Sequence, residues 1–367
     1  MGKSLEGQDA IIRFYIDHIL SLKMPVSRQA STSFAPFLRK YITYQILSET
    51  LIPQAERMLL RSPETALPLV DDLLSNTSCD LSPLIPAKLV PAVLAATKSS
   101  NVDNRTHAIS LMRSIINLTH DEQALVKLAN EIMVLPKTGK TVSPEHRAAL
   151  FNMLALLPAG QLSMDLLDTL APLISKEGNE FALTALCAAI TLHLTYTLAG
   201  DTPISPTASS SIVRELTSTK LSIRRAIISA VGSAIWAVRS VQSQFSPAGS
   251  NFLQTIVPAL ESSLKVASAN LPTNPLGFLE GYVATAVTLG PLASLEAGKA
   301  LMASSVMQGV LVVSPKPSFV LNERVQAKVS TPEDERWLLR CLEVIILANP
   351  EKLGPESTRC VHIKASC

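Results

Sequence analysis

Two kinds of residue recur along this chain at a spacing close to 41 residues, and that spacing limits the folds open to it. The first kind is a proline preceded by apolar residues, and its members are Pro53, Pro91, Pro136, Pro172 and Pro258. Pro53 and Pro258 lie 205 residues apart, which is five intervals of 41. One mark is missing near position 213. We interpret each proline as the mark of the first helix of a repeated unit.

The second kind is an arginine in the first turn of a following helix. Arg105, Arg147 and Arg224 have this position, and they lie 42 and 77 residues apart, which is roughly one and two periods. A period of about 40–47 residues with two helices per unit is typical of HEAT and armadillo repeats. Each mark is weak alone, so the prediction depends on their common spacing.

The stretch from Leu51 to Arg113 indicates what one unit contains. Each half has two short apolar helices joined by a tight turn, and in the first half Ser62 is the expected N-cap and Pro63 the first helical residue. One such pair is too small to bury its own apolar face, so it must stack on copies of itself. The sequence therefore predicts an all-α fold, a right-handed α-solenoid of about eight HEAT/armadillo-like helix pairs.

We expect residues 1–349 to form one continuous solenoid and residues 350–367 to form an irregular tail. Two loops are predicted inside the solenoid, near 201–211 and 270–277. The first has the sequence DTPISPTASSS, whose prolines and serines cannot pack a core. After Pro350 the apolar period stops.

Composition supports helices and gives no sign of a strong global charge. Hydrophobic residues make up 47% of the chain and aromatic residues 4%, which disfavours a sandwich or barrel of aromatic, β-branched strands. The net charge of +2 gives no strong field toward DNA or a membrane. Five scattered cysteines indicate reduced thiols in a cytoplasmic protein, and the N-terminus has no signal-peptide pattern.

Two motifs suggest other functions but have simpler interpretations. Gly139-Lys140-Thr141 resembles the end of a phosphate-binding loop, yet Val134 occupies the position where that loop needs its first glycine. Phe181 to Gly200 is a charge-free run long enough to span a membrane, but it falls in phase with the second helices. We expect a helix-ending glycine and a buried repeat helix, respectively. No residue pattern supports an enzyme, a cofactor or a metal site.

Cations gather at the predicted turns within the helix pairs. For Arg105, Arg147 and Arg224 we favour a structural ladder, in which each arginine bonds to acids and carbonyls of adjacent repeats. Lys137, Lys140 and Arg225 are the candidates for contact with a partner, since a basic ridge can bind phosphates. For His107 and His146 we expect solvent-facing positions.

Six segments together resemble one protein family. They are FAPF (34–37), LIPQAERMLLRSPE (51–64), CDLS (79–82), KSSNVDNR (98–105), LPKTGKTVSPEHR (135–147) and PSFVLNERVQAKVSTPEDERWLLRCLE (317–343). They are similar to the N-terminal region of the general-control-nonderepressible-one translational activator, a giant cytosolic HEAT-repeat protein of fungi and animals. The resemblance runs from about residue 5 to residue 347.

This resemblance implies a part in translational stress control. The family senses stalled or collided ribosomes, passes uncharged-tRNA stress to the kinase of the alpha subunit of initiation factor two, and works with an ATP-binding-cassette partner. The regions that resemble the partner-binding and kinase-binding parts are absent from this chain. We therefore expect a fungal fragment that serves as a non-catalytic, ribosome-contacting arm. The alternative is a generic HEAT-repeat adaptor that binds a helical peptide or protein partner.

Overall fold

The computed structural model describes the part of the chain that runs from the first helix through residue 269, with short gaps, and a few later segments. These residues are 2–20, 31–34, 36, 39–84, 89–160, 162–241, 245–269, 311–313, 319–321, 331–332, 334–336 and 339. The chain divides into two compact units. Unit 1 comprises Met1–Leu162 and Lys176–Leu192, and unit 2 comprises Ser163–Ser175 and His193–Cys367.

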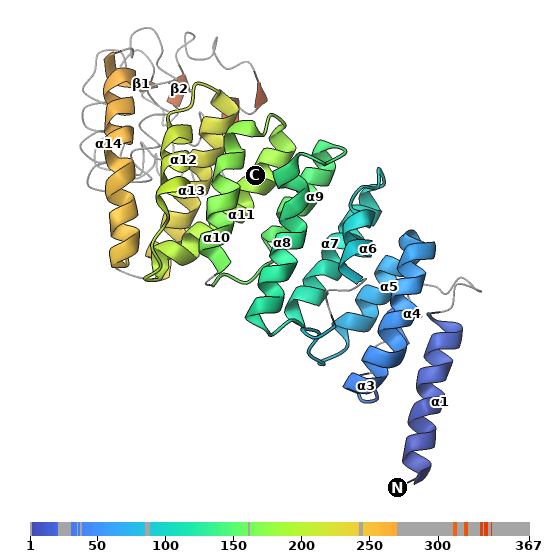
Figure 1. Cartoon of the computed structure of the whole chain (residues 1–367). Helices are drawn as coiled ribbons and strands as arrows, with labels where there is room; N and C mark the ends of the chain where they lie inside the picture. Colours follow the sequence, from blue (N-terminus) through green and yellow to red (C-terminus); the bar gives the residue numbers. More distant parts are fainter. Residues whose placement is uncertain are drawn as a thin grey trace. The chain divides into compact units, whose positions relative to one another are not determined.

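Unit 1 consists of helices that follow one another in antiparallel pairs (Figure 1). Their bounds are α1 (Gly2–His18), α3 (Tyr44–Ile46), a π-helical turn (Leu47–Leu51), α4 (Ile52–Arg61), α5 (Pro63–Ser75), α6 (Leu89–Ala96), α7 (Val102–Asn117), α8 (Glu122–Thr138), α9 (Pro144–Leu154) and the first part of α11 (Glu180–Ala199).

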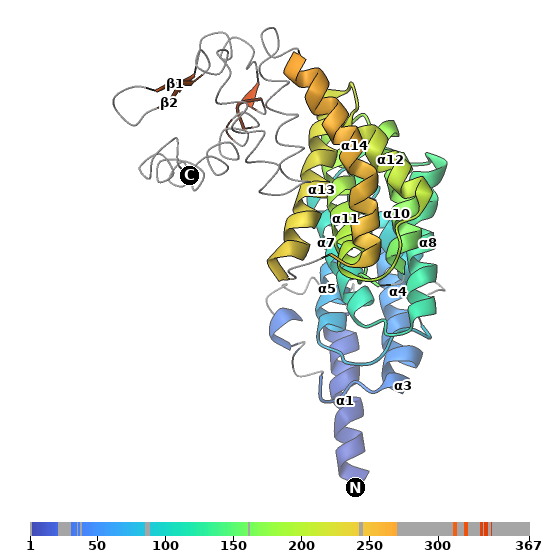
Figure 2. The same cartoon turned by 90° about the vertical axis from the view of Figure 1, so that its left-hand side faces the viewer.

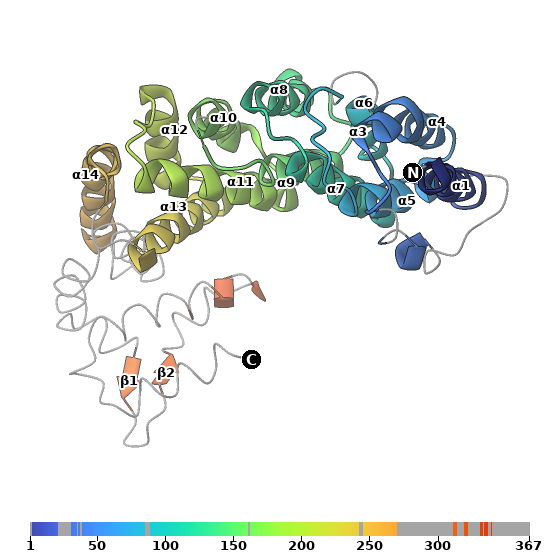
Figure 3. The ribbon, with the colours of Figure 1, turned by 90° about the horizontal axis from the view of Figure 1, so that it is seen from below.

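The helices of unit 1 pack as two layers. Within each pair, α4 packs on α5, α6 on α7 and α8 on α9, while between pairs α4 packs on α6, α5 on α7 and α7 on α9. Figure 3 shows α4, α6 and α8 in one row and α5, α7 and α9 in the other. This arrangement of like helices beside like helices is that of a helical repeat. The predicted all-α repeat fold is confirmed.

Capping residues set where the helices of unit 1 begin. The side chain of Asn101 accepts a hydrogen bond from the Asp103 backbone N–H at 2.8 Å, and Asp121 accepts one from Ala124 at the same distance. Both bonds satisfy a donor that the first helical turn leaves without a partner. Ser62 precedes α5 as predicted, but its side chain makes no capping bond.

The core of unit 1 is densest where α5 meets α7. The two helices bury apolar side chains at helical spacing, and those with no exposed surface include Leu67, Val70, Leu73, Leu74, Leu111, Met112 and Ile115. A helix pair on its own would leave this face in water, at a cost of about 1.5–3 kcal/mol for each large side chain. Stacking of the pairs therefore stabilises each of them.

Unit 2 contains the remaining described elements. They are α10 (Leu162–Leu170), a 3₁₀ helix (Ala171–Lys176), the second part of α11, α12 (Pro206–Leu216), α13 (Leu221–Val241), α14 (Pro247–Ala269), β1 (Leu311–Val313) and β2 (Phe319–Leu321). Helix α12 packs on both α13 and α14. The packing of α12 beside α14 can be followed in Figure 2.

One local prediction in unit 2 is wrong. The loop predicted over 201–211 ends early, because α12 begins at Pro206 and the Ser205 side chain caps it by accepting a bond from the Ala208 N–H at 3.1 Å. Later in the unit, β1 pairs antiparallel with β2, with Val312 opposite Val320. The loop near 270–277 and the tail at 350–367 lie outside the described residues. Continuity of one solenoid over 1–349 stays a prediction.

The prolines that mark the repeat do not occupy a constant position within their helices. Pro53 and Pro91 lie near the starts of α4 and α6, whereas Pro136 lies near the end of α8 and Pro258 inside α14. The arginine marks are more regular. Each is the fourth residue of its helix, in α7, α9 and α13.

Candidate functional site

The turns within the helix pairs carry the predicted ladder arginines, and two of these reach back over their own turn. Arg105 donates from Nη1 to the carbonyl oxygens of Ser99 at 2.7 Å and Ser100 at 2.9 Å. Arg224 donates in the same way to the Ser218 oxygen at 2.8 Å, again six residues earlier. Both of these Arg105 bonds run to carbonyls of the turn between α6 and α7, while the charge of Arg105 also helps to lower the pKa of Glu145 on α9, in the next pair.

Arg147 bonds to an acid beyond its own pair. Its Nε and Nη2 donate to the two carboxylate oxygens of Glu177 at 2.7 and 2.9 Å, and the Glu177 side chain is only 5% exposed. Burial alone would raise the pKa of Glu177, but the bonds from Arg147 and from the Asn179 backbone N–H hold that pKa below its ordinary value. This bidentate pair ties α9 to the segment that precedes α11.

Lys137 and Lys140 lie exposed on either side of the residue that ends α8. Gly139 has the left-handed conformation, with φ of 67°, and the Lys140 N–H donates back to the Leu135 oxygen at 3.2 Å. Glycine adopts this conformation at little cost, so the turn is well defined. The two ammonium groups therefore project from a fixed backbone. Their contact with a partner stays a prediction.

Arg225 does not belong with these exposed cations, and its predicted role as a surface contact is wrong. It is 5% exposed and pairs with Asp334, with 2.8 Å between Nη1 and Oδ1. Successive residues of a helix point about 100° apart, so Arg225 faces the packed side of α13 while its neighbour Arg224 lies over the turn.

His146 is buried rather than solvent-facing, which corrects a second expectation. Its Nδ1 accepts a hydrogen bond from the Val142 backbone N–H at 3.3 Å. Burial, together with the nearby charges of Lys98 and Arg147, lowers the pKa of His146. The imidazole is thus neutral at pH 7 and serves the packing of the turn.

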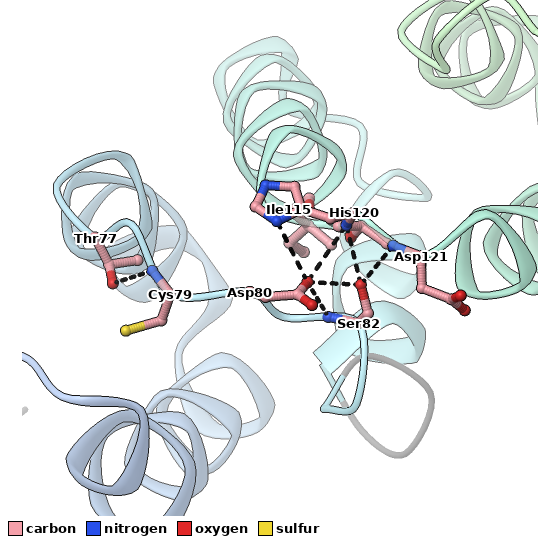
Figure 4. A network of polar contacts seen from close by, with 8 residues as sticks. Thr77, Cys79, Asp80, Ser82, Ile115, His120 and Asp121 are labelled. Atoms are coloured by element: carbon pink, nitrogen blue, oxygen red, sulfur yellow. Dashed lines mark hydrogen bonds and ion pairs between the residues drawn. The ribbon is translucent and has the colours of Figure 1, made fainter.

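Sequence reasoning missed a polar cluster in the loops that connect one pair to the next (Figure 4). One oxygen of Asp80 accepts from the hydroxyl of Ser82 at 2.6 Å and from its backbone N–H at 2.9 Å. The Ser82 hydroxyl in turn accepts from the backbone N–H groups of His120 and Asp121, both at 2.9 Å. The bonds join the loop before α6 to the loop before α8. We call these four residues the loop clasp.

The signal for the loop clasp was present in the sequence as the segment CDLS at 79–82. Leu81, between Asp80 and Ser82, is fully buried and donates its N–H to the Leu118 oxygen at 2.8 Å. The partners of this segment lie about one repeat later in the chain. Nothing in the sequence identifies those partners.

Replacing Ser82 with alanine should lower the free energy of unfolding by about 1–2 kcal/mol. The change removes the acceptor of two backbone N–H groups and leaves the start of α8 less well held. Urea unfolding followed by circular dichroism measures the effect. Ser100→Ala is the matched control, because Ser100 is an exposed turn serine. Equal midpoints for the two variants would contradict a structural role of the clasp.

Two further observations limit the chemistry of this surface. Among the residues that the structure describes, no group of three or more His, Cys, Asp or Glu side chains could hold a metal ion.

Helices α11 and α13 are long and apolar enough to cross a membrane by length and composition alone. However, 61% and 56% of their most apolar stretches are buried within the fold, as expected for repeat helices.

Stacked helix pairs, turns lined with cations and clasped loops together define a helical-repeat protein. The segment 144–359 matches the family described as General control nonderepressible 1 (Gcn1) N-terminal, and 8–141 matches the one described as Stalled ribosome sensor GCN1 N-terminal. The chain belongs to the Gcn1 N-terminal family. The resemblance seen in the sequence is confirmed.

Three relatives show how much of such proteins the chain covers. It is 27% identical over 168 residues to the eIF-2-alpha kinase activator GCN1 of Saccharomyces cerevisiae, which is 43% of this chain and 6% of the relative. It is 24% identical to Protein ILITYHIA of Arabidopsis thaliana over 50% of this chain and 7% of the relative. It is 25% identical to the human stalled ribosome sensor GCN1 over 35% of this chain and 5% of the relative. The chain thus spans only a small part of the length of these relatives.

Proposed function

We propose that this chain is a non-catalytic scaffold of translational stress control and contacts the ribosome in the cytoplasm. Membership of the Gcn1 N-terminal family is the observation that carries the proposal. The names of its relatives describe a stalled ribosome sensor and an eIF-2-alpha kinase activator. Contacts with that kinase and with an ATP-binding-cassette partner are assigned by the resemblance to other regions, so we do not propose them here.

The turn after α8 is the contact that we propose within unit 1. Lys137 and Lys140 are both exposed and lie on either side of Gly139, where the Lys140 N–H bonds back to the Leu135 oxygen. Two ammonium groups on a fixed turn can approach phosphates of ribosomal RNA without losing backbone freedom on binding. Arg225 is excluded from this contact by its burial.

Reversing both charges, with Lys137→Glu and Lys140→Glu, should weaken cosedimentation with ribosomes. Each lost phosphate contact should flatten the dependence of log K on log salt by about 0.7–0.9. Lys127→Glu is the control with the same charge change per residue, because Lys127 is an exposed residue in the middle of α8.

The controls separate the possible results. If the double variant and Lys127→Glu bind with the same salt slope as the unaltered chain, the turn is not the contact. If the unaltered chain stays in the supernatant at low salt, the ribosome-binding proposal itself is rejected.

One observation favours the adaptor as the second candidate. Within unit 1, helix α11 exposes Phe181 and Leu192 on one uncharged face, with exposed fractions of 63% and 37%. An apolar face of this kind suits the apolar side of a partner helix. The adaptor function would be favoured if the chain bound a helical peptide, if Phe181→Asp abolished that binding, and if the chain did not cosediment with ribosomes.

A further inference from the structure

A buried ion pair holds a late segment of the chain against α13 within unit 2. Nη1 of Arg225 lies 2.8 Å from Oδ1 of Asp334, and the two side chains are 6% and 11% exposed. Breaking such a pair leaves a charge in the protein interior, which is strongly unfavourable. The pair therefore holds Asp334 against α13.

The other oxygen of the Asp334 carboxylate is bound to Thr331. Oδ2 accepts the Thr331 hydroxyl at 2.9 Å and the Thr331 backbone N–H at 3.2 Å. The Thr331 hydroxyl accepts the Asp334 backbone N–H at 3.1 Å. One carboxylate thus joins a capping box to the ion pair, so a change at the Thr331 hydroxyl acts directly on the partner of Arg225.

Thr331 is accessible from solvent and lies in a sequence that a protein kinase can bind as a substrate. It is exposed, and Pro332 follows it directly. A residue before proline is held in an extended conformation, which is the form in which substrates enter a kinase active site. Three acids, Glu333, Asp334 and Glu335, come next in the sequence.

We propose that Thr331 is a phosphorylation site whose modification opens the Arg225–Asp334 ion pair and releases Thr331 and Asp334 from α13. In the modification, the Thr331 oxygen attacks the γ-phosphorus of magnesium-bound ATP and forms the new O–P bond. The bond from the γ-phosphorus to its bridging oxygen breaks, and ADP leaves with the electron pair. The hydroxyl proton passes to the base of the kinase.

Phosphorylation removes the hydrogen bond from the Thr331 hydroxyl to Asp334 and places two negative groups side by side. Thr331 loses its only hydroxyl donor to Asp334, and a group with a charge of about −1.5 to −2 is placed beside the carboxylate. The carboxylate must then withdraw from Thr331. Both effects act against the capping box. This inference does not depend on ribosome binding.

Labelling of the whole chain tests the site. A proline-directed Ser/Thr kinase with magnesium and ATP should place phosphate on Thr331, as located by mass spectrometry. Thr202 is the internal comparison, since Pro203 follows it and its side chain is half-buried. Phosphate on Thr202 without phosphate on Thr331 would overturn the proposal.

Amide hydrogen exchange tests the release. The N–H groups of Thr331, Asp334 and Glu335 are bonded in the closed form, and each should exchange at least about tenfold faster once phosphothreonine occupies position 331. Arg225→Met should reproduce that exchange without phosphate, whereas Arg224→Met, at the adjacent turn-bonded arginine, should not. Unchanged exchange in the phosphorylated chain would overturn the release, even if the Arg225 variant fails to fold.

Discussion

Arg147→Ala should lower the free energy of unfolding by about 3–5 kcal/mol at pH 7, the cost of leaving a buried charge without its partner. Glu177 is almost fully buried and receives two parallel hydrogen bonds from the guanidinium. Alanine removes both bonds and the compensating charge together. Urea unfolding followed by circular dichroism measures the loss.

Two substitutions test the cause of that effect. Arg147→Lys keeps the charge but cannot make the bidentate bond, so we expect a smaller but clear loss. Arg113→Ala is the matched control, because Arg113 is an exposed arginine on α7. If Arg113→Ala destabilised the chain as much as Arg147→Ala, the ion pair would not be the reason.

Arg147→Ala should also change how the free energy of unfolding depends on pH. In the unaltered chain the pKa of Glu177 lies below its ordinary value of 4.5, so its contribution is complete above that pH and is lost as the pH falls through the lowered pKa. Without Arg147, only backbone N–H groups still oppose the effect of burial, so the pKa of Glu177 rises relative to that in the unaltered chain. The difference between the two proteins should therefore shrink below about pH 4.5. A constant difference down to pH 3 would contradict this account.

Gly249→Ala should lower the stability of unit 2 by about 2–3 kcal/mol, because the added carbon has no space. A Cβ at this position would lie 2.6 Å from the Leu198 carbonyl oxygen, at the end of α11. The same oxygen accepts the Ser246 hydroxyl at 3.2 Å, so the backbone of α11 cannot withdraw without losing that bond. The measurement is the thermal unfolding midpoint.

A second glycine gives the control. A Cβ on Gly178 would meet no atom within 4 Å, so Gly178→Ala should leave the midpoint almost unchanged. If both substitutions lowered it equally, the effect would come from the general cost of replacing glycine and not from the close approach of α14 to α11.

Much of the fold could be predicted because local chemistry repeats. The rule applied to Ser62 and Pro63, a serine cap followed by a proline at the first helical position, also holds at α9, where Pro144 begins the helix and the Ser143 side chain accepts the His146 N–H at 3.1 Å. Ser205 and Pro206 obey that rule as well. We mispredicted them because neighbouring prolines and serines suggested a continuous loop. That error was one of interpretation, since the capping signal was present.

The candidate site was less predictable, because exposure depends on packing. Arg224 and Arg225 are adjacent and chemically identical, yet one lies over a turn and the other is buried against Asp334. Position 334 is more than 100 residues later in the chain. Likewise, nothing around His146 in the sequence showed that its ring would be enclosed.

Sequence alone determined the class of this protein: paired helices, their capping residues, the arginine at the fourth position of α7, α9 and α13, and the family to which the chain belongs. These follow from interactions within a few residues or from a repeated spacing along the chain. Only the tertiary structure decided which cations are exposed and which are buried, as with Lys140 and Arg225. The partner of Arg225 is Asp334, and the distance between two side chains in space is not set by their separation in sequence.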